Sequence, residues 1–81
     1  MSKVVLLDAG PLGLVTNPRG GVDAVGCYRW MQALLQRGVQ FVISEISDYE
    51  VRRELLRVGS DEGLTRLDLI AHIPGVVYAP L

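Results

Sequence analysis

The amino-acid sequence predicts an α/β fold, a parallel β-sheet flanked by helices. Short apolar runs alternate along the chain with longer segments of helical period, the pattern of strands joined by helical crossovers. The first run, Val4 to Leu7, is apolar at every position, which is typical of a strand covered on both faces of a parallel sheet. The 81 residues are 49% hydrophobic and 21% charged, which indicates a single small globular domain.

Strands are expected near residues 3–7, 39–43 and 76–78, and helices near residues 22–37, 45–58 and 61–72. A short helical turn is expected near Leu12 to Val15. Gly38 and Gly59 follow the first two helical segments as conventional helix stops. Ser60 opens the last helix as a favourable cap, with Asp61 and Glu62 behind it.

Composition bears on compartment and on partners. The one cysteine, Cys27, forms no internal disulfide and fits a reducing cytoplasm. The apolar run before Asp8 is too short for a signal peptide or a membrane span, so the expectation is a cytoplasmic protein without a membrane partner. A formal net charge of −1 gives no general support for nucleic-acid binding, which must therefore rest on local features.

Asp8 is the first candidate site residue. It directly follows the predicted first strand, and ligands of parallel sheets collect at the carboxyl ends of strands. Ser44 ends the second strand and is expected at the same edge. The alternative for Asp8 is that it only caps a helical turn beginning near Pro11, and spacing alone does not decide between the two interpretations.

Glu50 is the second candidate, one turn into the helix after the second strand. Together with Asp8 it could hold Mg²⁺ or Mn²⁺, which take oxygen ligands. Two structural alternatives compete and weigh more on spacing alone. The segment Ser47 to Glu50 fits a capping box, and Glu50 also shares a helix face with three charged residues that could form an ion-paired stripe, Arg53, Glu54 and Arg57.

Arginines make the one dense basic patch, Arg52, Arg53 and Arg57. Beside a metal, all three arginines would meet the phosphate backbone of a nucleic acid, and Ser44 and Arg53 are the candidate substrate-binding residues. The alternative, which spacing alone favours, is that the arginines neutralise Glu50 and Glu54. His72 is interpreted as a helix C-terminal residue rather than a catalyst, and Trp30 as part of the core.

The surroundings of the two acids resemble a known family. KVVLLDAGPLG is similar to the first strand and first acidic motif of PIN-domain ribonucleases, with Ala9-Gly10-Pro11 where many members have Thr-Asn. VISEISDYEVRREL, residues 42–55, is similar to the second motif, in which a strand ending in Ile-Ser precedes a helix that carries the second acid. By this resemblance Asp8 and Glu50 are catalytic, metal-binding carboxylates, and Ser44 occupies the position of the motif's serine.

The resemblance implies a strand order of 3-2-1, an Mg²⁺- or Mn²⁺-dependent endoribonuclease acting on RNA, and an antitoxin protein as partner, since many members are toxins of toxin–antitoxin pairs. The sequence departs from the family after Glu50, where nothing stands in for the remaining acids or for the later strands. The expectation is therefore a PIN-like sheet truncated to three strands, with weak metal binding and little activity of its own.

Two other classes remain open. One is a non-catalytic module for dimerisation or partner binding. The other is a phosphotransfer or phosphatase domain with Asp8 as nucleophile, which ranks third because Ala9 and Gly10 offer no second acid or threonine. A homodimer is also expected, because the first strand would be an exposed edge and the helical stripe containing Met31 and Leu34 would be uncovered.

Overall fold

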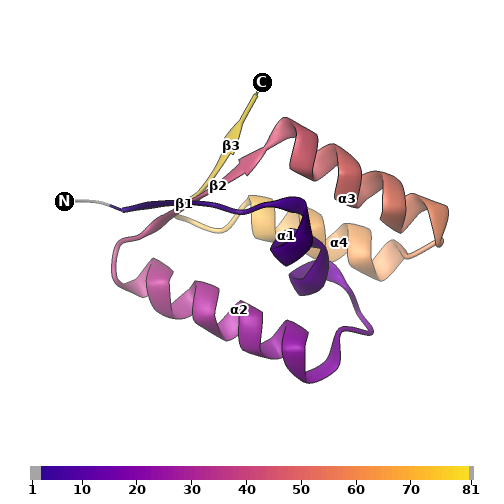
Figure 1. The fold of residues 1–81 in the computed structure, drawn as a ribbon, viewed down its shortest axis with the longest axis horizontal. Coiled ribbons are helices and arrows are strands. Elements are labelled where there is room, and N and C mark those ends of the chain that lie inside the picture. The colour runs from indigo at the N-terminus through magenta and orange to yellow at the C-terminus, as the bar shows by residue number, and fades with distance from the viewer. Residues whose placement is uncertain (1–2, 81) are drawn as a thin grey trace.

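The computed structural model describes residues 3–80, which form a three-stranded sheet and four helices (Figure 1). In chain order the elements are β1 (Val4–Leu6), α1 (Ala9–Thr16), α2 (Gly21–Gln36), β2 (Gln40–Ser44), α3 (Glu45–Arg57), α4 (Asp61–Ala71) and β3 (Val76–Ala79). The α/β class is confirmed, and the three expected strands and the three longer expected helices are each present to within one or two residues at their ends.

The sheet is parallel throughout, with β2 between β1 and β3. The expected order 3-2-1 is thus confirmed. Leu6 pairs with Val42, and Val42 pairs with Val77, so that one row of side chains crosses all three strands. Two crossovers that step in the same direction along a sheet place their helices on one face when both are right-handed.

The helix α1 is longer than the sequence predicts. It spans eight residues rather than one turn, with Leu12 and Val15 buried beneath it. Thr16 ends the helix in a fully buried position, where its hydroxyl donates to the carbonyl oxygen of Leu12 at 2.9 Å. Within residues 3–80 no helix combines the length and apolar character needed to cross a membrane.

The helices bury one face of the sheet. Phe41 and Ile43 of β2 are fully buried, and Val5 and Val76 of the flanking strands pack against the same core. Met31 of α2 is also fully buried in this core. The expectation of an uncovered helical stripe containing Met31 is therefore wrong, because α2 packs that side chain against the sheet. The buried apolar cluster comprises Leu7, Leu12, Val15, Met31, Val39, Phe41, Ile43, Val51, Leu55, Leu67 and Ile70.

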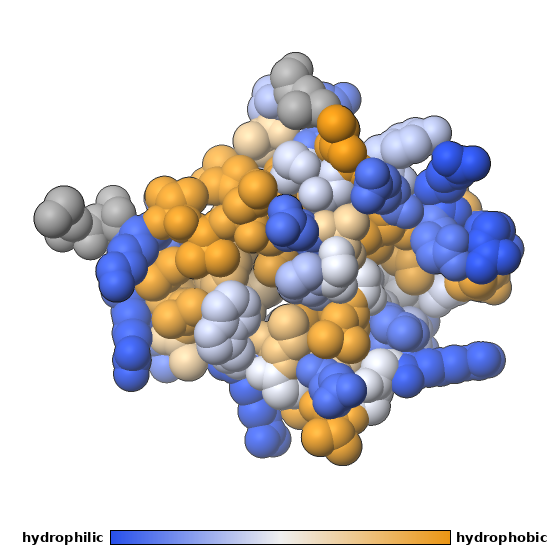
Figure 2. Space-filling model, viewed as in Figure 1, coloured by the Kyte–Doolittle hydropathy of each residue, from blue (hydrophilic) through white to orange (hydrophobic). Residues whose placement is uncertain are grey.

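The other face of the sheet is open. Val4 and Leu6 are 60% and 58% exposed, and Val77, in the same row as Leu6, is 44% exposed. Figure 2 shows hydrophobic residues gathered over the region of β1 and β2. The prediction that β1 is covered on both faces is wrong, because both crossovers of the described chain pack their helices against the opposite face.

Glycines end two of the helices, as the sequence predicts. Gly38 and Gly59 have φ values of 83° and 69°, in the left-handed region that glycine enters at no steric cost. Each therefore turns the chain sharply out of its helix, Gly38 into β2 and Gly59 into α4.

Candidate functional site

Asp8 lies between β1 and α1, at the carboxyl end of its strand. The preceding Leu7 is buried, and its amide donates to the carbonyl oxygen of Val42 at 2.8 Å, which fixes the chain to β2 up to this point. Asp8 occupies the N-cap position of α1, and its carbonyl oxygen accepts from the amide of Leu12 at 3.0 Å. Its exposed side chain makes no capping hydrogen bond, so capping does not account for the carboxylate.

Ser44 is the residue that caps α3. Its hydroxyl oxygen accepts from the amide of Ser47 at 3.1 Å and lies 3.0 Å from the hydroxyl of Ser47, to which it donates. The helix therefore begins at Glu45, and Ser47 lies inside the first turn. The capping-box interpretation of Ser47 and Glu50 is wrong for this reason. Glu50 lies beyond the first turn and is not needed for capping.

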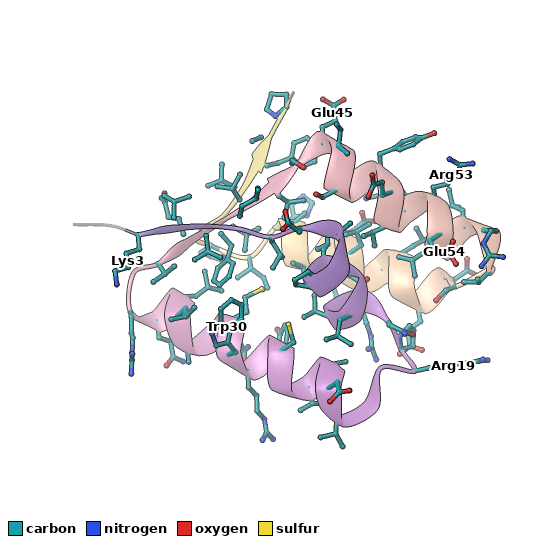
Figure 3. All side chains as sticks on the ribbon, viewed as in Figure 1. Lys3, Arg19, Trp30, Glu45, Arg53 and Glu54 are labelled. Atoms are coloured by element: carbon teal, nitrogen blue, oxygen red, sulfur yellow. The ribbon has the colours of Figure 1, made fainter. Side chains whose placement is uncertain are left out.

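The charged face of α3 is only partly an ion-paired stripe. Arg57 donates to both carboxylate oxygens of Glu54, at 3.0 and 2.5 Å, and this hydrogen bonding lowers the pKa of Glu54. Glu50 and Arg53, on the same helix face, form no ion pair or hydrogen bond through their side chains within residues 3–80. Figure 3 shows Arg53 pointing away from the body of the molecule. The stripe interpretation thus explains Glu54 and Arg57 but leaves Glu50 unpaired.

Arg52 has a different role from its neighbour Arg53. Its guanidinium bonds Asp48 in the same helix at 3.3 Å and Asp68 of α4 at 2.9 Å. These bonds, first to Asp48 and then to Asp68, raise the pKa of Arg52. Arg52 therefore joins α3 to α4 and is not available to a phosphate group in the way that Arg53 is.

A groove runs between α1 and α3 and continues to the start of α4. It begins at Ala9 and Gly10, directly after Asp8, and Glu50 lines it from the opposite helix. Four acidic side chains and one arginine line its length, Glu50, Glu54, Asp61, Glu62 and Arg19. This excess of negative charge attracts cations, and it repels a phosphate group that has no cation bound to it. Asp61 and Glu62 were not expected in this groove. The signal in the sequence was the turn at Gly59, which folds α4 back against α3.

The donor set available for a metal is small. Within residues 3–80, no group of three or more His, Cys, Asp or Glu side chains gathers closely enough to hold a metal ion. Mg²⁺ is commonly held by one or two carboxylates together with water and substrate phosphate. Two carboxylates such as Asp8 and Glu50 would therefore need water and substrate oxygens to complete the coordination of a metal ion.

The remaining candidates have structural explanations. His72 follows α4, and its Nδ1 lies 2.6 Å from the carbonyl oxygen of Asp68, to which it must donate because a carbonyl oxygen only accepts. Trp30 reaches from α2 toward the sheet (Figure 3), where its ring meets Phe41 edge-on at 5.6 Å between centroids. The residue is nevertheless 47% exposed, so its interpretation as part of the core is wrong, and Trp30 lies at the margin of the core instead. Cys27 is partly buried against the core as a free thiol.

Searches of this chain against protein-family models, curated proteins and solved structures found no match.

Proposed function

We propose that this chain carries part of a divalent-metal-dependent endoribonuclease site of the PIN type, with Asp8 and Glu50 as its metal-binding carboxylates. The observation that supports the proposal is the state of these two side chains. Asp8 sits in a capping position without capping, and Glu50 lies unpaired, within residues 3–80, in the groove that begins beside Asp8.

Each residue has a distinct part in this proposal. Asp8 offers oxygen ligands from the end of β1 and Glu50 from α3, the helix that follows β2, and a bound Mg²⁺ or Mn²⁺ would activate water and stabilise charge on an RNA phosphate. Arg53 is exposed and without an ion-pair partner in the described chain, so it can contact the RNA backbone. Ser44 is a positioning residue, because its hydroxyl holds the start of the helix that carries Glu50.

Two carboxylates make a weak site. We expect dissociation constants for Mg²⁺ or Mn²⁺ in the millimolar range or weaker. A constant of this size corresponds to a binding free energy no more favourable than about −4 kcal/mol. Little RNA cleavage is expected from residues 1–81 by themselves, because a metal held by so few ligands is poorly oriented for attack on a phosphodiester.

The test is titration of the ¹⁵N-labelled chain with Mn²⁺, followed by paramagnetic broadening of amide resonances. Broadening should centre on residues 8–10 and on Glu50, and Asp8→Asn and Glu50→Gln should each reduce it at both places. Glu62→Gln is the matched control, because Glu62 lines the same groove but is paired with Arg66 at 2.8 Å. Broadening that is unchanged by Asp8→Asn, or metal-dependent RNA cleavage that survives Asp8→Ala, would place the site elsewhere.

A non-catalytic module for partner binding is the second candidate function. The open face of the sheet favours it, because a row of apolar side chains, Leu6, Val42 and Val77, crosses all three strands without helical cover in the described chain.

A further inference from the structure

The strand β1 lies at an edge of the sheet with unpaired backbone groups. The carbonyl oxygen of Lys3 accepts from Gln40 at 2.9 Å, and the amide of Leu7 donates to Val42 at 2.8 Å. Backbone groups alternate in direction along a strand, so those of Lys3, Val5 and Leu7 point toward β2. The amide and carbonyl groups of Val4 and Leu6 consequently point away from the sheet, where residues 3–80 supply no strand to pair with them.

The opposite edge of the sheet is less available. Along β3, Gly75 pairs toward β2, since its carbonyl oxygen accepts from Phe41 at 2.8 Å. The outward groups are therefore those of Val76 and Tyr78. The amide of Val76 is already bonded to the carbonyl oxygen of Ile73 at 3.0 Å, and Pro80, just past the strand, has no amide to offer. Of the two edges, β1 is the better template for another strand.

We infer that β1 pairs with β1 of a second copy of this chain, antiparallel and about a two-fold axis through Val5. In this register Val4 of each copy lies opposite Leu6 of the other. Both residues carry outward amide and carbonyl groups, so each such pair exchanges two hydrogen bonds, as hydrogen-bonded pairs of an antiparallel ladder do. A two-fold axis is the commonest closed arrangement for identical chains.

The sequence of β1 suits its own antiparallel partner. The strand lies between Lys3 and Asp8, so antiparallel pairing brings the basic end of each copy alongside the acidic end of the other. The exposed side chains of Val4 and Leu6 lie on the open face and become cross-strand neighbours, which adds apolar contact to the hydrogen bonds. The two open faces then join on one side of a continuous six-stranded sheet.

The contact between the two copies is small, so the dimer should form only at high protein concentration. The strand β1 has three residues, and pairing that extends over residues 3–7, at about 3.3 Å each, buries roughly 200–300 Å² per copy, against about 800 Å² in a standard interface. A contact this small is expected to be weak, so the dimer should be reversible.

Sedimentation equilibrium from about 10 µM to about 1 mM tests the association. The mass should rise from that of one chain, 8.9 kDa, toward twice that value. Val4→Pro removes an outward amide that the sheet itself does not use, so the fold should survive while the dimer weakens at least tenfold. Tyr78→Pro is the matched control at the other edge and should leave the association unchanged. A monomer at every concentration, or equal loss of the dimer in both variants, would overturn the inference.

Amide hydrogen exchange provides a test without mutation. Exchange at the Leu6 amide should slow as the concentration rises, while exchange at the Tyr78 amide should not. Concentration-dependent protection of Tyr78 instead would assign the contact to β3. Loss of the dimer in Val77→Lys, with Leu6 unprotected, would show that the open faces stack rather than the edges pair.

Discussion

Gly63, in the first turn of α4, leaves no free space for a side chain. A Cβ added there would overlap Leu55 Cδ2 of α3, approach the capping Ser60 Oγ to 2.8 Å, and lie 3.3 Å from the carbonyl oxygen of Thr16 at the end of α1. Leu55 and Thr16 are both buried, and the Ser60 hydroxyl accepts the Gly63 amide at 3.1 Å. The substitution Gly63→Ala therefore presses on three elements at the point where α1, α3 and α4 meet.

The magnitude follows from opposing effects. Alanine in place of glycine favours a helix by about 0.5–1 kcal/mol. Overpacking of a well-filled core costs about 1–3 kcal/mol, and disturbance of a serine cap costs up to about 1 kcal/mol more. We expect Gly63→Ala to lower the free energy of unfolding by about 1–3 kcal/mol. Gly26→Ala, in the exposed part of α2 with no atom within 4 Å of the added Cβ, should raise it by about 0.5–1 kcal/mol.

Urea denaturation followed by circular dichroism measures both variants against the parent chain. The two alanines should shift the unfolding midpoint in opposite directions. If Gly63→Ala stabilises the chain as much as Gly26→Ala does, then α4 does not pack against Leu55 and Thr16 as described here.

Three further expectations concern α3. Ser44→Ala should cost about 1 kcal/mol of stability in urea denaturation, because the helix loses its cap, and an unchanged midpoint would contradict that role. Arg52→Met should cost less than about 1 kcal/mol, since its bond to Asp68 is largely exposed, and the loss should shrink at high salt; a loss independent of salt would argue against ion pairing. The pKa of Glu54 is lowered by Arg57, so their bond contributes above the ordinary carboxyl range and is lost as the pH falls through the lowered pKa. Carboxyl NMR titration should show this pKa rising in Arg57→Gln, and an unmoved value would contradict the pairing.

The regular elements were predictable because their signals are local. The periodic apolar positions of α2 and the stop at Gly38 define that helix without reference to anything distant in the sequence. Parallel pairing followed from the alternation of strands and helices. The length of α1 was not predictable, because Thr16 is held by burial against the rest of the fold rather than by helix propensity.

The positions of the candidate residues in the fold were predictable, but the surroundings of those residues were not. Spacing placed Asp8 and Glu50 after neighbouring strands, yet it could not show that Ser44, rather than Ser47, caps the helix. Both serines fit a helix start, and which of them caps α3 depends on the residue at which β2 ends. Met31 was misjudged for a similar reason. An apolar stripe on a helix does not reveal which face of the sheet covers it, and here the sheet face left open belongs to Leu6 and Val77.

The position of β2 between two parallel neighbours also determines how the chain would bear a mechanical load. Force applied at residues 3 and 80 pulls β1 and β3 in opposite directions along their own axes, on either side of β2. The hydrogen bonds of both ladders are then loaded in shear, and those of a ladder must break together rather than one after another. Stretching from these ends should give a higher rupture force than pulling β2 and β3 apart at right angles to their axes. Force in that direction breaks the hydrogen bonds of one ladder in succession from its end. The force needed to unfold the chain should therefore depend on the direction in which the sheet is pulled.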